Sequence, residues 1–350
     1  MKKKLLTICL CSILFISGCF SQTGEYTFDI VFLTDVTGKQ SAQTKSMQDA
    51  LKKQADAYGY NYEVVLPSNT KELSDAISLS FENKTDFIAT SSKNIADILV
   101  AKAEDYPDTK VLLAGQIGSA DNVVYLDFKM EEAAFLAGLL AAKTSKTGTV
   151  GYIGIEGDKY NAYEIGFEFG AKTYDYKTQI VKAYTESYAD VDEGYECAKA
   201  LNEQGADVIF ADCAASSIGV NNYVVQKQLY IICSDLYTLK DNDRCLGYTY
   251  KNYDELFSLA LVNCANNSYN YGVYRYGIYD KVLGFDYSDD ISDTSQELLK
   301  EYEYNLTWMR QIVPSNRDEL TSMSEQLRID YENRKTQSAP EDTTQIPVEQ

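Results

Sequence analysis

Short apolar runs alternate with longer stretches of helical spacing along most of this chain, and this alternation leaves few folds open to it. It predicts parallel strands joined by helices that cover both faces of a sheet. The first series of runs lies at residues 28–33, 62–66, 86–89, 110–114 and 123–126, and the second at 150–154, 179–183, 207–211, 230–233 and 246–249. Ten strands are too many for one sheet in a chain of 350 residues, so the two series predict two similar α/β lobes.

The stretches between the strands predict helices, among them 43–59, 131–143, 188–205 and 252–263. Small residues in the helix at 131–143 predict close packing against a sheet, and this helix is expected to open the second lobe. The tyrosine-rich segment 269–287 alternates as a strand pair does. Residues 293–333 have a helical pattern with Trp308 on a packing face, and the polar end at 334–350 predicts a disordered tail.

The N-terminus has the pattern of an export signal. Three lysines are followed by an apolar run at 5–16 and by Ser17-Gly18-Cys19, and the run is too short to span a bilayer comfortably. The segment resembles a bacterial lipobox, in which cleavage before Cys19 leaves a diacylated N-terminus; a plain signal peptide with a stray cysteine is the alternative. We therefore expect a signal peptide at 1–18, a tether at 19–27, and a protein lipid-anchored on the extracytoplasmic face of the cell membrane.

Composition excludes several classes of function. The chain contains no histidine, so Ser-His-Asp and Cys-His nucleophiles and HExxH zinc helices are excluded. The formal net charge of −20 disfavours binding to nucleic-acid polymers and to anionic headgroups, while small neutral or cationic ligands are compatible with it. No cofactor is expected.

Cysteine spacing gives no sign of a metal site. The cysteines that follow Cys19 are Cys197, Cys213, Cys233, Cys245 and Cys264, and none forms a CxxC pair. An exported chain can form disulfides, but positions near strand ends favour buried free thiols. The acidic stretch 286–293 lacks the spacing and the glycine of an EF-hand, which favours a solvated loop over a calcium site.

Polar residues follow several of the apolar runs. Ligands of open parallel sheets gather beyond the carboxyl ends of the strands, where Asp35, Asp212 and Asp235 stand immediately after apolar runs. Ser91 and Ser234 end two others. Carboxylates in that position can accept hydrogen bonds from ligand hydroxyls or amines, although any one aspartate can instead cap a helix. Recurrence after three strands favours a binding edge.

Five segments in the same order resemble the basic membrane protein family, lipoprotein substrate-binding components of ABC importers, several of which bind purine nucleosides. They are residues 106–110, 128–138, 146–154, 164–170 and 205–210. The resemblance implies a two-lobed type I periplasmic-binding fold whose chain crosses between lobes near residues 127, 247 and 281. It assigns 28–127 with 248–281 to the first lobe and 128–247 with 282–290 to the second. The helical pattern beyond them predicts a C-terminal helical extension at 291–333.

The resemblance also implies ligand contacts. Asp235 and Lys251 match family residues expected near a ribose, and Tyr163 matches an aromatic residue that can stack on a base. Where the family has Lys-Ser-Phe-Asn this chain has Lys39-Gln40-Ser41-Ala42, so Lys39 and Ser41 remain polar candidates while a stacking phenylalanine is absent. A family glycine is replaced by Ser91. These departures weaken the case for a nucleoside more than the case for a small polar solute.

The favoured interpretation is a membrane-anchored extracytoplasmic solute-binding lipoprotein that closes two lobes on a small polar ligand, with a nucleoside as one candidate, and delivers it to ABC permease subunits. The alternative is an accessory surface lipoprotein of the same fold that senses a ligand without transport. A hydrolase using two of Asp35, Asp212 and Asp235 is a third reading, but no spacing of acids supports it, and the chain is not expected to be an enzyme.

Overall fold

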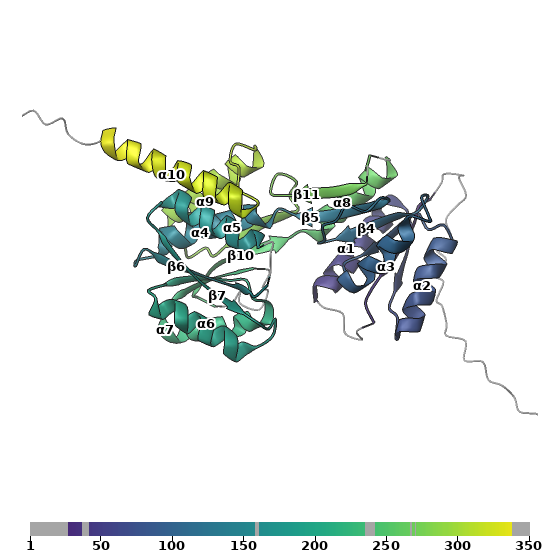
Figure 1. The fold of residues 1–350 in the computed structure, drawn as a ribbon, viewed down its shortest axis with the longest axis horizontal. Helices are drawn as coiled ribbons and strands as arrows, with labels where there is room; N and C mark the ends of the chain where they lie inside the picture. Colours follow the sequence, from purple (N-terminus) through teal and green to yellow (C-terminus); the bar gives the residue numbers. More distant parts are fainter. Residues whose placement is uncertain are drawn as a thin grey trace, which may run out of the picture.

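The computed structural model describes residues 27–36, 42–157, 161–234, 242–266, 268–269 and 271–337. They form two lobes that lie side by side and are joined near β5, β10 and β11 (Figure 1). Within these ranges no helix has both the length and the apolar character needed to cross a bilayer.

The first lobe is a six-stranded parallel sheet with strand order β11-β5-β4-β3-β1-β2. Its strands are β1 (Asp29–Leu33), β2 (Asn61–Val65), β3 (Phe87–Thr90), β4 (Lys110–Ala114), β5 (Val123–Phe128) and β11 (Gly272–Tyr276), and its helices are α1 (Ala42–Tyr58), α2 (Thr70–Glu82), α3 (Lys93–Ala103) and α8 (Tyr253–Ala265).

The second lobe has strand order β12-β10-β9-β8-β6-β7, parallel except for β12 at its edge. Its strands are β6 (Thr149–Ile155), β7 (Gln179–Thr185), β8 (Val208–Ala211), β9 (Tyr230–Ser234), β10 (Cys245–Lys251) and β12 (Leu283–Tyr287). Its helices are α4 (Met130–Thr144), α5 (Ala162–Tyr174), α6 (Val191–Glu203), the 3-10 turn η1 (Ala214–Ser216), α7 (Ser217–Lys227), α9 (Asp293–Thr307) and α10 (Arg317–Gln337).

Alternation along the strands explains why helices cover both faces. In β1, Ile30 and Phe32 pack with α1 and α8, whereas Val31 and Leu33 pack with α2 and α3. In the same way β8 faces α4 and α5 on one side and α6 and α7 on the other. Figure 1 shows the second sheet between these two pairs of helices. Every second side chain is buried on each face, which is the pattern of a central parallel strand.

Helices α4 and α5 of the second lobe pack closely against each other at glycine residues. A Cβ placed at Gly138 of α4 would lie 2.1 Å from the carbonyl oxygen of Phe167, and one at Gly170 of α5 would lie 2.0 Å from that of Phe135. The small residues of α4 therefore admit a neighbouring helix. The prediction that they serve packing against a sheet is incomplete, because the closest approach is to α5.

The chain crosses between the lobes three times, after β5, after β10 and after β11. The predicted boundary near residue 247 is wrong, because β10 pairs with β12 as far as Lys251 and so belongs to the second sheet throughout. The predicted strand pair at 269–287 is also wrong, since β11 and β12 lie in different sheets. Between them the chain makes its third crossing.

The C-terminal extension consists of two helices, α9 and α10. α9 packs on α4, where the rings of Phe135 and Tyr302 are 5.4 Å apart, and α10 packs on α5 through Leu320. Trp308 caps the end of α9 with 60% of its surface exposed, so it does not lie on a packing face as predicted. Helix α10 continues to Gln337, past the predicted start of the tail.

The five cysteines after residue 190 are free thiols. Cys213, Cys233, Cys245 and Cys264 are buried and Cys197 is half-buried. Burial raises the pKa of Cys213 and of Cys264 to about 12, so both stay protonated and unreactive at neutral pH.

Candidate functional site

The carboxyl edges of both sheets lie at the junction between the lobes. The first and second crossings leave directly from the carboxyl ends of β5 and β10, and the strands beside them run parallel to them apart from β12. Asp35 and Ser91 follow β1 and β3 in the first lobe, whereas Asp212 follows β8 and Ser234 and Lys251 end β9 and β10 in the second. Tyr163 lies in the first turn of α5. Four candidate residues, Cys19, Lys39, Ser41 and Asp235, lie outside the described residues.

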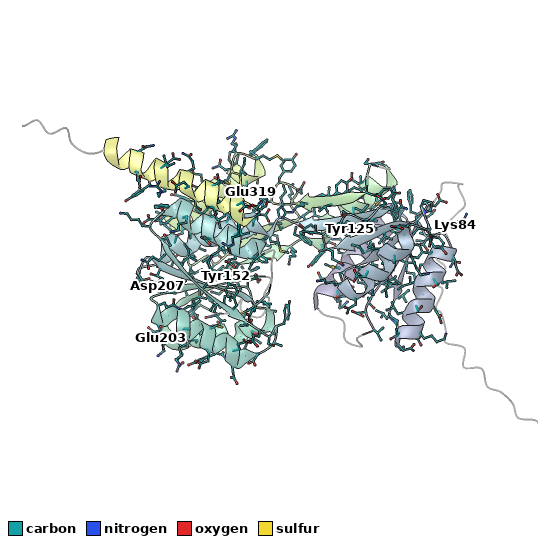
Figure 2. The ribbon with its side chains drawn as sticks, in the orientation of Figure 1. Lys84, Tyr125, Tyr152, Glu203, Asp207 and Glu319 are labelled. Carbon is teal, nitrogen blue, oxygen red and sulfur yellow. The ribbon has the colours of Figure 1, made fainter. Side chains whose placement is uncertain are left out.

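Asp212 and Ser234 are in direct contact. The Ser234 hydroxyl donates a hydrogen bond to Asp212 Oδ1 at 2.6 Å, and the Tyr152 hydroxyl approaches Oδ2 at 2.9 Å. Figure 2 shows Tyr152 within the second lobe. Helix α7 takes Ser216 as its N-cap, so Asp212 does not serve the capping role that was the alternative for it. Its carboxylate is held at the sheet edge by side chains from two other strands.

Lys251 lies between aromatic rings of both lobes. Its Nζ is 5.7 Å from the ring centre of Phe128, which ends β5, and 5.9 Å from that of Tyr163. Both distances fall within the range of cation–π attraction. The Thr249 hydroxyl donates to the Tyr163 hydroxyl at 3.3 Å and so fixes the far end of the tyrosine. A cation and an aromatic face are therefore presented together at the junction.

Lys251 also lines a cavity of about 550 Å³ between α1 and the start of α8. This volume is within the range of small-molecule sites. The wall carries two ion pairs, Lys45 with Asp49 and Lys53 with Asp254, each at 2.7 Å. These charged side chains offer hydrogen bonds to a polar occupant.

In the first lobe Asp35 is held by the start of α3. Its Oδ2 accepts hydrogen bonds from the Ser92 hydroxyl at 2.9 Å and from the Asn94 amide at 2.8 Å. Burial works to raise the pKa of Asp35, but the hydrogen bonds from Asn94, Ser92 and the Val36 amide outweigh it and lower the pKa. The group is a carboxylate at neutral pH and can accept hydrogen bonds from a solute. Ser92, not the predicted Ser91, contacts it.

Several residues of the site escaped the sequence prediction, namely Ser92, Asn94, Phe128, Tyr152, Asn161 and Thr249. One of them carried a recognisable signal. Asn161 precedes α5 and Glu164 follows three residues later, which is the spacing of a capping box, and the Glu164 amide indeed donates to Asn161 Oδ1 at 3.0 Å. In the described part of the chain, no group of three or more His, Cys, Asp or Glu side chains is arranged to hold a metal ion.

Residues 29–316 match the sequence profile described as ABC transporter substrate-binding protein PnrA-like. Basic membrane protein A of Borreliella burgdorferi B31 is 27% identical over 339 residues, covering 91% of this chain and 97% of that protein. The shared length is nearly complete in both proteins.

Two solved structures have the same fold. A transcriptional activator of the comK gene from Bacillus halodurans gives a TM-score of 0.70 at 16% identity, covering 81% of this chain and 99% of that one. An ABC transporter system solute-binding protein from Aeropyrum pernix K1 gives 0.63 at 17% identity, covering 86% and 98%. The expected α/β architecture of the type I periplasmic-binding class, with two parallel-dominated sheets flanked by helices, is confirmed.

These matches also settle the class of protein. The matched profile describes substrate-binding components of transporters, so the expectation that the chain is a binding protein and not an enzyme is confirmed. With most of its length covered by that profile, the chain belongs to the basic membrane protein family of PnrA-like ABC transporter substrate-binding proteins.

Proposed function

We propose that this chain is the lipid-anchored, extracytoplasmic solute-binding subunit of an ABC importer, and that its solute is a small polar molecule with hydroxyl or amine donors and a flat ring, as in a purine nucleoside. One observation carries the proposal. The carboxyl edges of the two sheets bring fixed carboxylates, Asp35 and Asp212, and a lysine beside an aromatic ring to the junction between the lobes.

The chemistry of these groups fits such a solute. Ribose hydroxyls can donate to Asp212 or Asp35, and a charge-assisted hydrogen bond of this kind contributes about 1.5–3 kcal/mol. Tyr163 offers a ring on which a base can stack, and Lys251 can donate to hydroxyl or carbonyl oxygens. A solute that contacts both lobes stabilises the closed arrangement, because those contacts exist only when the lobes approach.

Removal of the lysine charge is expected to abolish most of the affinity. We predict that purine nucleosides raise the melting temperature of the wild-type protein, and that Lys251→Met weakens their binding about tenfold to a hundredfold, the equivalent of one charge-assisted hydrogen bond. Thermal shift and titration calorimetry with nucleosides, free bases and sugars would measure this. Stabilisation by sugars alone would remove the nucleoside from the proposal.

Asp207 provides a matched control for Asp212. Both carboxylates flank β8, but Asp207 lies at the amino end, where its oxygens accept from the Ser145 hydroxyl at 2.6 Å and the Lys146 amide at 2.7 Å (Figure 2). Asp207→Asn should lower stability without changing affinity, while Asp212→Asn should lower affinity about tenfold or more. Equal loss of binding in both variants would contradict the assignment of the carboxyl edge.

The proposed anchor has its own test. In cells that lipidate exported proteins, Cys19→Ala should abolish incorporation of a labelled fatty acid and the release of the signal peptide that depends on lipidation. Fractionation of membranes and metabolic labelling measure both. Unchanged labelling in the variant would show that the acyl chains are attached elsewhere.

In a second candidate function the chain has the same fold but does not serve a transporter. One observation favours a sensing lipoprotein without a permease: α10 begins at Arg317, just beyond the matched residues 29–316, and is firmly docked on the second lobe. Solute uptake by cells lacking this chain decides between the two. Uptake that is unchanged while the purified protein still binds the solute would favour the sensor.

A further inference from the structure

A continuous set of side chains within hydrogen-bonding distance of one another runs through the second lobe from Asp212 to α10. The Tyr152 hydroxyl lies 2.9 Å from Asp212 Oδ2 and 2.8 Å from Asn161 Oδ1. Tyr152 is fully buried, and burial, followed by the nearby Asp212 charge, raises its pKa well above the ordinary value. The hydroxyl therefore keeps its proton at all physiological pH values. We refer to Asp212, Tyr152, Asn161, Glu164 and Arg317 as the relay.

The orientation of Asn161 in the relay is fixed. Its Nδ2 donates to Glu164 Oε2 at 3.1 Å, and its Oδ1 accepts from the Glu164 backbone amide at 3.0 Å. A flipped side chain would put two donors against each other at the backbone amide and two acceptors against each other at the carboxylate. Asn161 thus presents a carbonyl oxygen, an acceptor, to the Tyr152 hydroxyl.

Tyr152 then has one proton and two acceptors. A tyrosine hydroxyl donates a single hydrogen bond, and both Asp212 Oδ2 and Asn161 Oδ1 lie within reach of it. The proton can point to Asp212 or to Asn161, which precedes α5. The hydroxyl therefore has two alternative hydrogen-bonded states. The Asp212 carboxylate is the stronger acceptor, and a better acceptor at Asn161 weakens the hydrogen bond from Tyr152 to Asp212.

The far end of the relay is in contact with α10. Glu164, whose side chain is 5% exposed, is contacted by Arg317, by Lys182 at 2.9 Å and by the Tyr184 hydroxyl at 3.0 Å. The other arm of Arg317 binds Glu168 at 3.0 Å. Arg317 is the first residue of α10, and Leu320 buries the next turn of that helix in the core. Docking of α10 thus places a cation on the buried carboxylate that orients Asn161.

We propose that α10 sets the solute affinity of the Asp212 side of the site through this relay, with Tyr152, Asn161 and Arg317 as positioning residues. This rests on the proposed function of the chain as a solute binder. Arg317 draws electron density from Glu164, which makes the Asn161 carbonyl a weaker acceptor and leaves the Tyr152 proton on Asp212. Without Arg317 the Asn161 carbonyl competes more strongly for the Tyr152 proton, and the hydrogen bond that holds the Asp212 carboxylate for a solute becomes weaker.

The first experiment needs no solute. In protein labelled with ¹³C at tyrosine Cζ, whose chemical shift reports hydrogen bonding of the hydroxyl, Tyr152→Phe identifies the Tyr152 resonance. Arg317→Met should shift that resonance, and Arg317→Lys should restore part of the shift. Arg328→Met is the matched control, because Arg328 lies on the same helix and pairs only within it in the described structure, with Glu325 and Glu332. An unmoved Tyr152 resonance in Arg317→Met, or an equal shift in Arg328→Met, would overturn the proposal.

The second experiment uses a purine nucleoside. Arg317→Met should weaken its binding about threefold to tenfold, the size of coupling that residues outside a site exert on it. In the Tyr152→Phe background Arg317→Met should have no further effect, because the hydroxyl that transmits it is gone; additive losses would overturn the relay. A further outcome is that no nucleoside binds the wild-type protein while Arg317→Met still shifts the Tyr152 resonance. In that case the nucleoside assignment fails, but the coupling of α10 to Asp212 is supported.

Discussion

Replacing Gly170 by alanine should lower the free energy of unfolding by about 3 kcal/mol or more, at the upper end of what overpacking costs. The new methyl group would lie 2.0 Å from the carbonyl oxygen of Phe135, inside van der Waals contact with backbone that cannot rotate away. Helix propensity favours alanine by about 1 kcal/mol, so the expected loss is net of that gain. The clash can then be relieved only if α4 and α5 move apart, and this movement would disturb the core of the second lobe. Denaturant unfolding measures the change.

A second glycine separates steric clash from backbone preference. Gly148 has φ +73° and no atom within 4 Å of the place that an added methyl group would take, so Gly148→Ala carries only the left-handed backbone penalty of about 1–2 kcal/mol. Gly170→Ala should therefore be clearly the more destabilised variant. If the two variants lose equal stability, close helix packing is not what requires glycine at position 170.

Replacing Arg275 by methionine should cost about 3 kcal/mol at neutral pH, as expected when one partner of a buried ion pair is removed. Arg275 Nε donates to Asp127 Oδ2 at 2.8 Å and Nη2 donates to Glu131 Oε2 at 3.0 Å. The Asp127 and Glu131 side chains are only 10% and 3% exposed, so each would be left as a buried charge. Arg275 and Asp127 belong to β11 and β5 of the first lobe, whereas Glu131 belongs to α4 of the second. The ion pair between Arg275 and Glu131 therefore also joins the two lobes, beside the crossings that follow β5 and β11.

The stability that the protein loses in Arg275→Met should depend on pH. Burial raises the pKa of Glu131, and the charge of Arg275 offsets only part of this increase. In Arg275→Met the folded-state pKa of Glu131 rises further, so the folded state holds a proton that the unfolded chain has already lost. Stability of the variant therefore falls as pH rises from the unfolded pKa, about 4.3, through the raised folded value. In chemical unfolding at pH 4.5 and pH 7.5, the difference in free energy of unfolding between wild type and Arg275→Met should be smaller at pH 4.5.

The double variant Glu131→Gln with Arg275→Met tests the cause. Glutamine removes the uncompensated charge while keeping the shape of the side chain, so it should recover part of the stability lost in Arg275→Met and flatten the pH dependence. A double variant as unstable and as pH-dependent as the single one would mean that Glu131 is not the group responsible.

Much of the fold was predictable because strands that are buried on both faces are short continuous apolar runs in the sequence. Ile30, Val31, Phe32 and Leu33 form such a run, and its length favours a central strand. It does not identify the partner of a strand. The tyrosine-rich segment resembles a hairpin in sequence because β11 and β12 both alternate, yet β11 pairs with β5 and β12 with β10. Long-range pairing of this kind has no local signature.

The contacts within the candidate site were predictable where they depend on position along a strand. Asp212 and Ser234 follow and end neighbouring strands, and they meet as parallel strands require. The relay was not predictable as a whole, since a buried tyrosine in β6 gives no sign in the sequence of which carboxylate and which amide it will meet. The capping-box spacing of Asn161 and Glu164 is a sequence signal for the contact between these two residues. Nothing in the sequence signals that Arg317, far along the chain, contacts Glu164.

The placement of β11 and β12 has a consequence for how the protein acquires its structure. Each is the outermost strand of a different sheet, β11 beside β5 and β12 beside β10, and both come from the last quarter of the sequence. During synthesis, β5 and β10 therefore present open backbone edges until residues 272–287 emerge, and open edges are templates for pairing with other chains. Neither sheet is complete before the last quarter of the sequence has emerged, so a truncation before residue 272 should yield two aggregation-prone halves rather than one finished lobe.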